Sequence, residues 1–147
     1  MPVKKHDFMY LPAGVKHGLA NPSAVELRFF VMGFKLAESP PPPAKPLMAN
    51  FDDIHKQALS SHPDSVVYQL LMGDVNSKRD RLAAGHLLTS LYMMEFAPDG
   101  TNFPHHHDAE EEIYILLDGV VRWSLEAEWM DWRRGFQPSP ATRISSG

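Results

Sequence analysis

The sequence predicts an all-β protein with one short helix. Runs rich in β-branched and aromatic residues recur along the chain, and turn-forming glycines and prolines separate them. Only one segment carries an apolar stripe at helical spacing. These observations favour a fold built from short strands, and we justify its elements in chain order.

The first two predicted strands are residues 7–11 and 25–36, with a turn at residues 11–14 (LPAG) between them. Residues 1–38 are therefore expected to form a strand-rich segment. Residues 39–50 begin with SPPPPAKP, in which proline fixes φ and lacks an N–H donor. This stretch is expected to be a stiff linker.

The one predicted helix starts just after the linker. Asn50 or Asp52 can cap it, and its apolar stripe is formed by Phe51, Ile54, Ala58 and Leu59. Beyond the helix, residues 66–72 and 87–96 are predicted strands, with a polar stretch between them. The helix and these strands begin a second β-rich segment that covers residues 51–120.

The segment 111–123 (EEIYILLDGVVRW) has apolar residues on both faces of a predicted hairpin centred on Asp118 and Gly119. A strand that is apolar on both faces has to be buried on both sides. We therefore expect a second sheet or a second copy of the chain to cover it, which makes a homodimer a reasonable hypothesis.

The last segment, residues 121–147, has a different character. The 28 residues from Val120 onwards contain all three tryptophans and four of the seven arginines, without a clean strand alternation. Such a composition specifies function poorly, so an irregular tail is the preferred interpretation over a binding module.

Composition bounds the class of protein. The 147 residues, 44% hydrophobic and 22% charged, suit one ordinary domain or two incomplete pieces of larger domains. No apolar run could span a bilayer and no secretory signal is recognisable, so we expect a cytoplasmic protein without a membrane partner. A net charge of −4 argues against nucleic acid as a partner, and the lack of cysteine leaves only histidine and carboxylate as strong metal ligands.

The strongest chemical signal is the stretch 100–119 (GTNFPHHHDAEEEIYILLDG). On a strand, His105 and His107 would project to one face, and His106 to the other. Glu112 follows beyond a turn at Asp108, where it could present its carboxylate to the same point. Two imidazoles and one carboxylate form a ligand set for one divalent transition metal ion: Fe, Mn, Ni, Cu or Zn.

The frame around these ligands resembles the first conserved motif of the cupin superfamily. It has a glycine, four residues, HxH, four residues, Glu, six residues and a glycine, whereas the family usually has five residues after the first glycine. The resemblance covers residues 100 to 119. It implies a cupin-type jelly-roll barrel in which His105, His107 and Glu112 are three of four metal ligands.

The second cupin motif is found near the N-terminus. Residues 12–21 (PAGVKHGLAN) match PxGxxHxxxN, which implies that His17 is a fourth metal ligand, although His6 stands where the full motif has a glycine. Cupins ordinarily run from the first motif to the second, and here the order is reversed. One account is a two-cupin chain cut at both ends, with His17 and the triad in different sites. The other is a permuted barrel or a strand-exchanged dimer in which His17 completes the shell around one ion.

Two function classes follow from the resemblance. The first is a metal-binding cupin, including a metal-dependent enzyme of the oxygenase or isomerase type that acts on a small polar organic molecule. The alternative is a non-catalytic binding or storage-type cupin without bound metal. Retention of metal by the purified protein separates the two.

Overall fold

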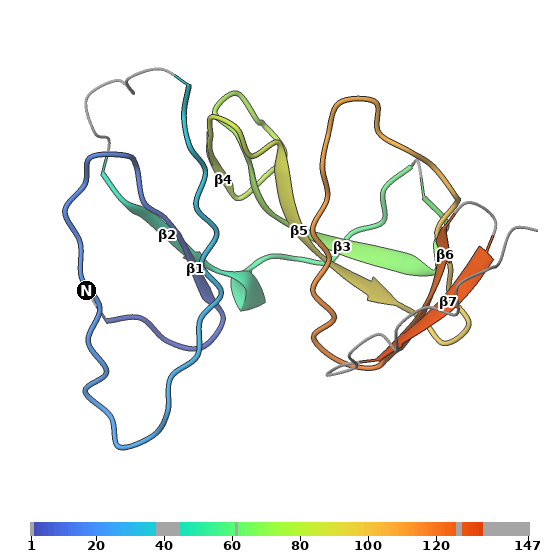
Figure 1. The fold of residues 1–147 in the computed structure, drawn as a ribbon, viewed down its shortest axis with the longest axis horizontal. Helices are drawn as coiled ribbons and strands as arrows, with labels where there is room; N and C mark the ends of the chain where they lie inside the picture. Colours follow the sequence, from blue (N-terminus) through green and yellow to red (C-terminus); the bar gives the residue numbers. More distant parts are fainter. Residues whose placement is uncertain (1, 38–44, 61, 126–127, 134–147) are drawn as a thin grey trace, which may run out of the picture. The chain divides into compact units, whose positions relative to one another are not determined.

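A computed structural model describes residues 2–37, 45–60, 62–125 and 128–133. The chain divides into two compact units, Met1–Asn102 and Phe103–Gly147, and we describe each by itself. Strands dominate both units and the only helix described is a single 3-10 turn, so the protein is all-β. The described strands form three small sheets, and no closed barrel is found among them (Figure 1).

The first sheet joins a strand near the N-terminus to the last residues of the predicted linker. Strand β1 (Asp7–Tyr10) pairs antiparallel with β2 (Leu47–Asn50). The prediction of a strand at residues 7–11 is confirmed, but the last four residues of the predicted linker form a strand instead. The prolines at the start of the linker lie mostly outside the described residues. The predicted turn is confirmed, since the N–H of Val15 donates to the carbonyl of Pro12 and Gly14 has a φ of 80°.

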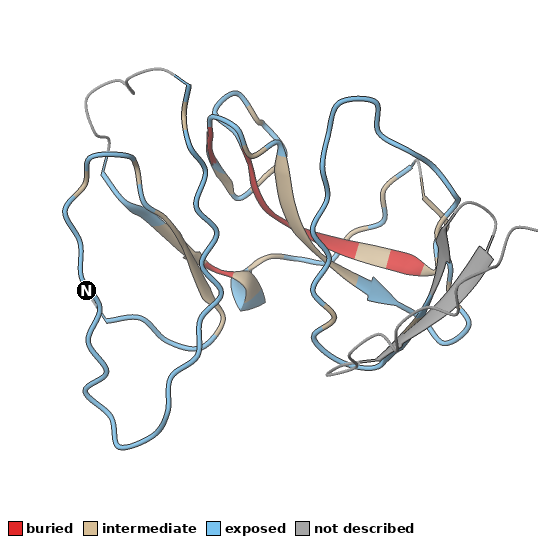
Figure 2. Cartoon of the chain, in the orientation of Figure 1, coloured by how far each residue is buried: buried red, intermediate tan, exposed pale blue. Residues whose placement is uncertain are grey.

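The second sheet contains the core of the first unit. Its central strand β3 (Val66–Asp74) lies between β4 (Leu82–Gly85), which is parallel to it, and β5 (Ser90–Phe96), which is antiparallel. Figure 2 shows that the buried residues follow β3 and reach β4. The predictions of strands at 66–72 and 87–96 are confirmed in position, whereas β4 lies in the stretch that was predicted to be a polar connection.

A glycine makes room for the connection between β3 and β4. A Cβ atom on Gly73 would lie 2.3 Å from Oδ2 of Asp80 and 2.8 Å from Cβ of Ser77. The carboxylate of Asp80 accepts hydrogen bonds from the hydroxyl of Ser77 and, at 3.2 Å, from Arg79 Nε. Because this polar loop folds tightly onto Gly73, the chain returns to the end of β3 after only a short connection.

The predicted helix is mostly wrong. Asn50 does cap a helix, because its side chain accepts a hydrogen bond from the N–H of Asp52, but the helix is a single 3-10 turn, η1 (Phe51–Asp53). The amide of Gln69 donates to the carbonyls of Phe51 and Ile54, both at 2.7 Å. Gln57 then forms an isolated bridge to Tyr68 on β3. Contacts with β3 therefore capture the backbone groups that a longer helix would have used.

The described part of the second unit contains one antiparallel pair of strands. Strand β6 (Val120–Leu125) pairs with β7 (Glu128–Arg133), so the described residues of the segment 121–147, which the sequence predicted to be irregular, are in strands. Residues 134–147 lie outside the described part. The predicted hairpin around Asp118 and Gly119 is also wrong: Gly119 has a φ of 85°, but the segment before it is not a strand.

Two segments that were predicted to be strands are not strands in the structure. These are residues 25–36 in the first unit and 111–117 in the second. Their large apolar side chains are exposed: Val31 is 81% exposed and Ile113 is 73% exposed. Apolar residues on two faces specify a strand only where a neighbouring strand or sheet can pack on them. No helix in the described part is long and apolar enough to cross a membrane.

Candidate metal centre

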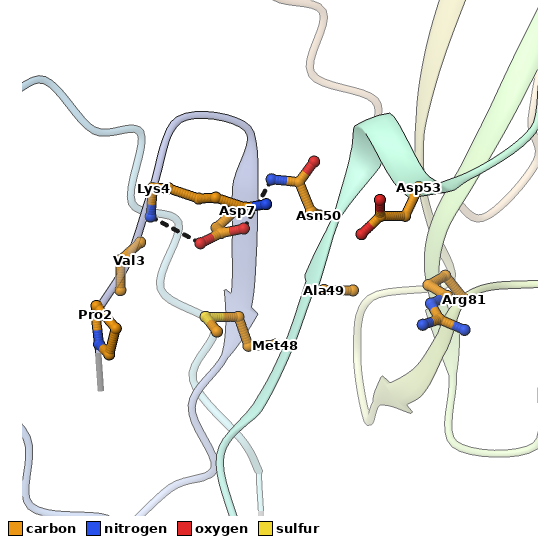
Figure 3. A pocket seen from close by; sticks show the side chains of 9 residues that line it. All are labelled: Pro2, Val3, Lys4, Asp7, Met48, Ala49, Asn50, Asp53 and Arg81. Carbon is orange, nitrogen blue, oxygen red and sulfur yellow. Dashed lines mark hydrogen bonds between the residues drawn. The ribbon is translucent and has the colours of Figure 1, made fainter.

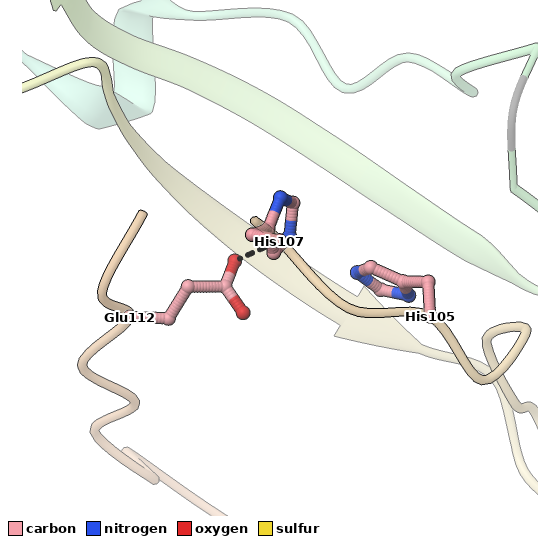
Figure 4. Close-up of side chains that lie close together, drawn as sticks. All are labelled: His105, His107 and Glu112. Carbon is pink, nitrogen blue, oxygen red and sulfur yellow. Dashed lines mark ion pairs between the residues drawn. The ribbon is translucent and has the colours of Figure 1, made fainter. Parts of the chain in front are cut away.

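Three of the four predicted ligands converge in the second unit. His105, His107 and Glu112 each offer a ligand atom, and the three atoms lie within 4.8 Å of one another (Figure 4). The loop that carries them has no strand, so the predicted strand alternation does not explain the convergence. It comes from an extended stretch that places His105 and His107 side by side and from a bend at Asp108 and Ala109 that returns the chain to Glu112.

The two histidines lie close enough to serve one ion. Their ring centroids are 5.1 Å apart with the ring planes at 87°. Nε2 of His107 lies 3.3 Å from Oε1 of Glu112. Two ligand atoms about 2.1 Å from one ion lie about 3.0–3.4 Å apart in octahedral or tetrahedral geometry, so this pair already has the spacing that a shared ion requires. Because no two of the three atoms are more than 4.8 Å apart, a pair has to close by at most about 1.8 Å around an ion.

The site lies at the surface of the second unit. The side chains of His107 and Glu112 are 34% and 32% exposed. An ion held there would keep contact with solvent, which leaves room for water or an organic ligand to complete its coordination. His106 is not part of the cluster, and its Nε2 lies 3.3 Å from the carboxylate of Asp108.

The neighbours of His105 fix which of its nitrogens is available to an ion. Nδ1 lies 2.8 Å from the carbonyl of Phe103. A carbonyl oxygen only accepts hydrogen bonds, so Nδ1 carries the proton and the lone pair of the neutral ring is on Nε2.

His17 belongs to the first unit. It follows the turn at residues 12–15, is exposed, and joins no group of three possible ligands among the described residues. Its Nδ1 lies 2.9 Å from the carbonyl of Val15, two residues earlier in the chain, which is the same arrangement that His105 has. The neutral His17 ring therefore also carries its lone pair on Nε2.

The residues around the triad were missed by the sequence reasoning. Glu110 Oε2 lies 3.3 Å from Nδ1 of His107, and the hydroxyl of Tyr114 donates to Oε2 of Glu112 at 2.8 Å. Nothing in the sequence distinguishes the carboxylate of Glu110 from those of Asp108 and Glu111 near it. The spacing of Tyr114, two residues after a proposed ligand, is a weak signal that becomes informative only once the side chains are placed.

A polar hollow in the first unit gives a contrast to the triad (Figure 3). It measures about 390 Å³, and residues of the N-terminal segment, of β2 and of η1, together with Arg81, line it. The carboxylate of Asp7 accepts hydrogen bonds from the N–H of Lys4 and the amide of Asn50, both at 2.8 Å. These two contacts, the backbone one first, lower the pKa of Asp7. Asp7 and Asn50 in this hollow therefore help to hold β1 to β2.

Comparisons of this chain with protein-family models, with curated proteins and with solved structures found no match.

Proposed function

We propose that this chain is a metal-binding cupin that holds one divalent transition metal ion through His105, His107 and Glu112. The single observation that supports this most is the convergence of these three ligand atoms within 4.8 Å. An ion of Fe, Mn, Ni, Cu or Zn takes a ligand set of two imidazoles and a carboxylate. The match of residues 100–119 to the first cupin motif supports the same proposal.

The proposed activity is that of a metal-dependent enzyme, of the oxygenase or isomerase type, on a small polar organic molecule. A bound ion would supply a Lewis acid or a centre for dioxygen. The three side chains supply at most three ligands, so water or substrate would occupy the remaining positions. His17, in the first unit, stays a ligand that the cupin resemblance predicts.

A metal-free binding or storage-type cupin is the second candidate, and one observation favours it. His107 lies between the carboxylates of Glu110 and Glu112, with one ring nitrogen 3.3 Å from each. A protonated imidazole would satisfy both carboxylates without any ion.

Elemental analysis of the untagged protein separates the two candidates. The metal-binding proposal predicts close to one equivalent of a transition metal in the wild-type chain and its loss in His107→Ala. His106→Ala is the matched control, because its side chain lies outside the cluster, and it should retain the metal. A metal-free wild-type protein that takes up no ion on addition of Fe, Mn, Ni, Cu or Zn salts would overturn the proposal.

We also propose that the chain pairs with a second copy of itself through the two exposed apolar segments. Phe30 and Val31 are 73% and 81% exposed, and such contiguous apolar surface on extended chain is a template for pairing. Sedimentation should give a dimer mass for the wild type. Val31→Glu should give a monomer, and Leu19→Glu, which introduces the same charge outside the segment, should not. A monomeric wild-type chain would contradict this proposal.

A further inference from the structure

We infer that Glu110 and Tyr114 are positioning residues of the metal site, and that each fixes which atom of a ligand side chain faces the ion. This inference rests on the proposed metal-binding function. It concerns residues that the cupin motif does not contain. The contacts that carry it all lie in one loop of the second unit.

His107 has two nitrogens, and their neighbours differ. Nε2 lies 3.3 Å from Oε1 of Glu112, and Nδ1 lies 3.3 Å from Oε2 of Glu110. Only one nitrogen of a neutral ring has a lone pair for an ion. If Nε2 binds the ion beside Glu112, Nδ1 carries the proton, and a small rotation of Glu110 brings its carboxylate to hydrogen-bond distance. A carboxylate in this place fixes the tautomer and makes the imidazole a stronger ligand.

Glu112 is held in the same way by Tyr114. The phenol donates to Oε2 at 2.8 Å, while Oε1 faces His107. The hydrogen bond occupies Oε2 and directs Oε1 toward the ion. Glu112 is therefore expected to bind mainly through Oε1, because the hydrogen bond from the phenol uses one of the two lone pairs of Oε2 and holds that oxygen toward Tyr114.

His105 completes the pattern with a backbone group. Its Nδ1 is held at 2.8 Å by the carbonyl of Phe103. The polar atom of His105 and of Glu112 that faces away from the ion is thus hydrogen-bonded by a group from the same loop, and that of His107 has the Glu110 carboxylate 3.3 Å away.

Co(II) titration of the full-length, untagged chain tests this inference. The visible absorption of bound Co(II) reports both affinity and coordination geometry. We expect Glu110→Ala to weaken Co(II) binding about 10–100-fold, which is the usual cost of removing such an orienting partner. Glu110→Gln keeps an oxygen acceptor for Nδ1–H and should recover most of the affinity. Glu111→Ala, which removes an exposed carboxylate of the same loop, is the matched control and should bind like the wild type.

Tyr114→Phe should weaken Co(II) binding about tenfold and change the shape of the absorption band, because Glu112 can then bind through both oxygens. Tyr10→Phe, a phenol of β1 in the other unit, should change neither. Circular dichroism of each variant verifies that it is folded, and a Glu110→Ala chain that fails to fold leaves Glu110→Gln and Tyr114→Phe to decide the result.

The outcomes separate this inference from the proposed function. If the wild type binds Co(II), His107→Ala does not, and the Glu110 and Tyr114 variants match their controls in affinity and spectrum, the positioning role is wrong and the metal site stands. If His107→Ala binds Co(II) with the same affinity as the wild type, the proposed metal site is wrong, and so is the positioning role of Glu110 and Tyr114.

Discussion

The core around β3 and the loop that carries the triad are built by different physical means. In the core, Val66, Tyr68 and Leu70 are at most 3% exposed and pack on Leu59, Tyr92 and Met94. In the loop, the ligands lie at the surface, and polar contacts between near neighbours in the chain place them. The core therefore gains its stability from apolar burial, whereas the loop is expected to gain its order from the ion that it binds.

The sharpest test of this comparison makes one substitution in the core and one in the loop, and measures stability and metal binding for both. Leu70→Ala should lower the free energy of unfolding by about 2–5 kcal/mol, because it opens a cavity in the core. Affinity of the folded protein for metal should not change. His105→Ala should do the reverse: it should strongly weaken metal binding and cost less than about 0.5 kcal/mol in the absence of metal. Urea unfolding and metal titration of both variants measure these effects, and a similar stability loss in the two would break the comparison.

A second test compares hydrogen bonds in the two regions. Asn50 is 6% exposed, and its side chain joins the carbonyl of Lys5, the carboxylate of Asp7 and the N–H of Asp52. Asn50→Ala should cost about 1–3 kcal/mol, since it removes these three hydrogen bonds and the N-cap of η1. Tyr114→Phe removes a bond at the surface and should cost much less without metal. Equal losses of unfolding free energy in Asn50→Ala and Tyr114→Phe would show that burial does not determine the cost of losing a hydrogen bond.

The smallest effect is expected at Tyr68, a core residue with a polar group. Its side chain is 1% exposed, and its hydroxyl has no hydrogen-bond partner among the described residues. Tyr68→Phe should therefore change stability at pH 7 by less than about 1 kcal/mol, and a gain is as compatible with the structure as a small loss.

At high pH the same substitution should become stabilising. Burial, with a smaller contribution from Tyr92, raises the pKa of Tyr68 from 10.0 to about 12. Between these values the unfolded phenol has lost its proton and the folded one has kept it, so the wild type loses stability as pH rises. Urea midpoints at pH 7, 10 and 11 should fall less for Tyr68→Phe than for the wild type and for the control Tyr10→Phe. Parallel curves for all three would contradict the role of Tyr68.

The local sequence pattern correctly predicted strands β1, β3 and β5. β3 is a mostly apolar run, and β1 and β5 have enough aromatic and apolar residues to be found from the sequence. The helix after Asn50 was mispredicted because the competing contact comes from Gln69, which is remote in sequence. The strands predicted at 25–36 and 111–117 failed for a related reason: a period of apolar residues does not reveal whether a partner strand exists.

The triad was easier to predict than its surroundings. The spacing of His105, His107 and Glu112 identified them as candidate ligands, although the reason given, alternation along a strand, was wrong for this loop. Glu110 and Tyr114 could not be singled out, because an acidic stretch offers several equivalent carboxylates and only the placed side chains distinguish them.

X-ray absorption spectroscopy of the metal-loaded chain tests the central claim most directly. Two imidazole nitrogens at about 2.1 Å and a carboxylate oxygen at about 2.0–2.2 Å should surround one ion, with the outer-shell scattering that imidazole rings produce. His105→Ala should remove one of the two imidazole contributions from whatever metal still binds. An ion surrounded by oxygen atoms alone, with the same spectrum in the wild type and in His105→Ala, would contradict the account.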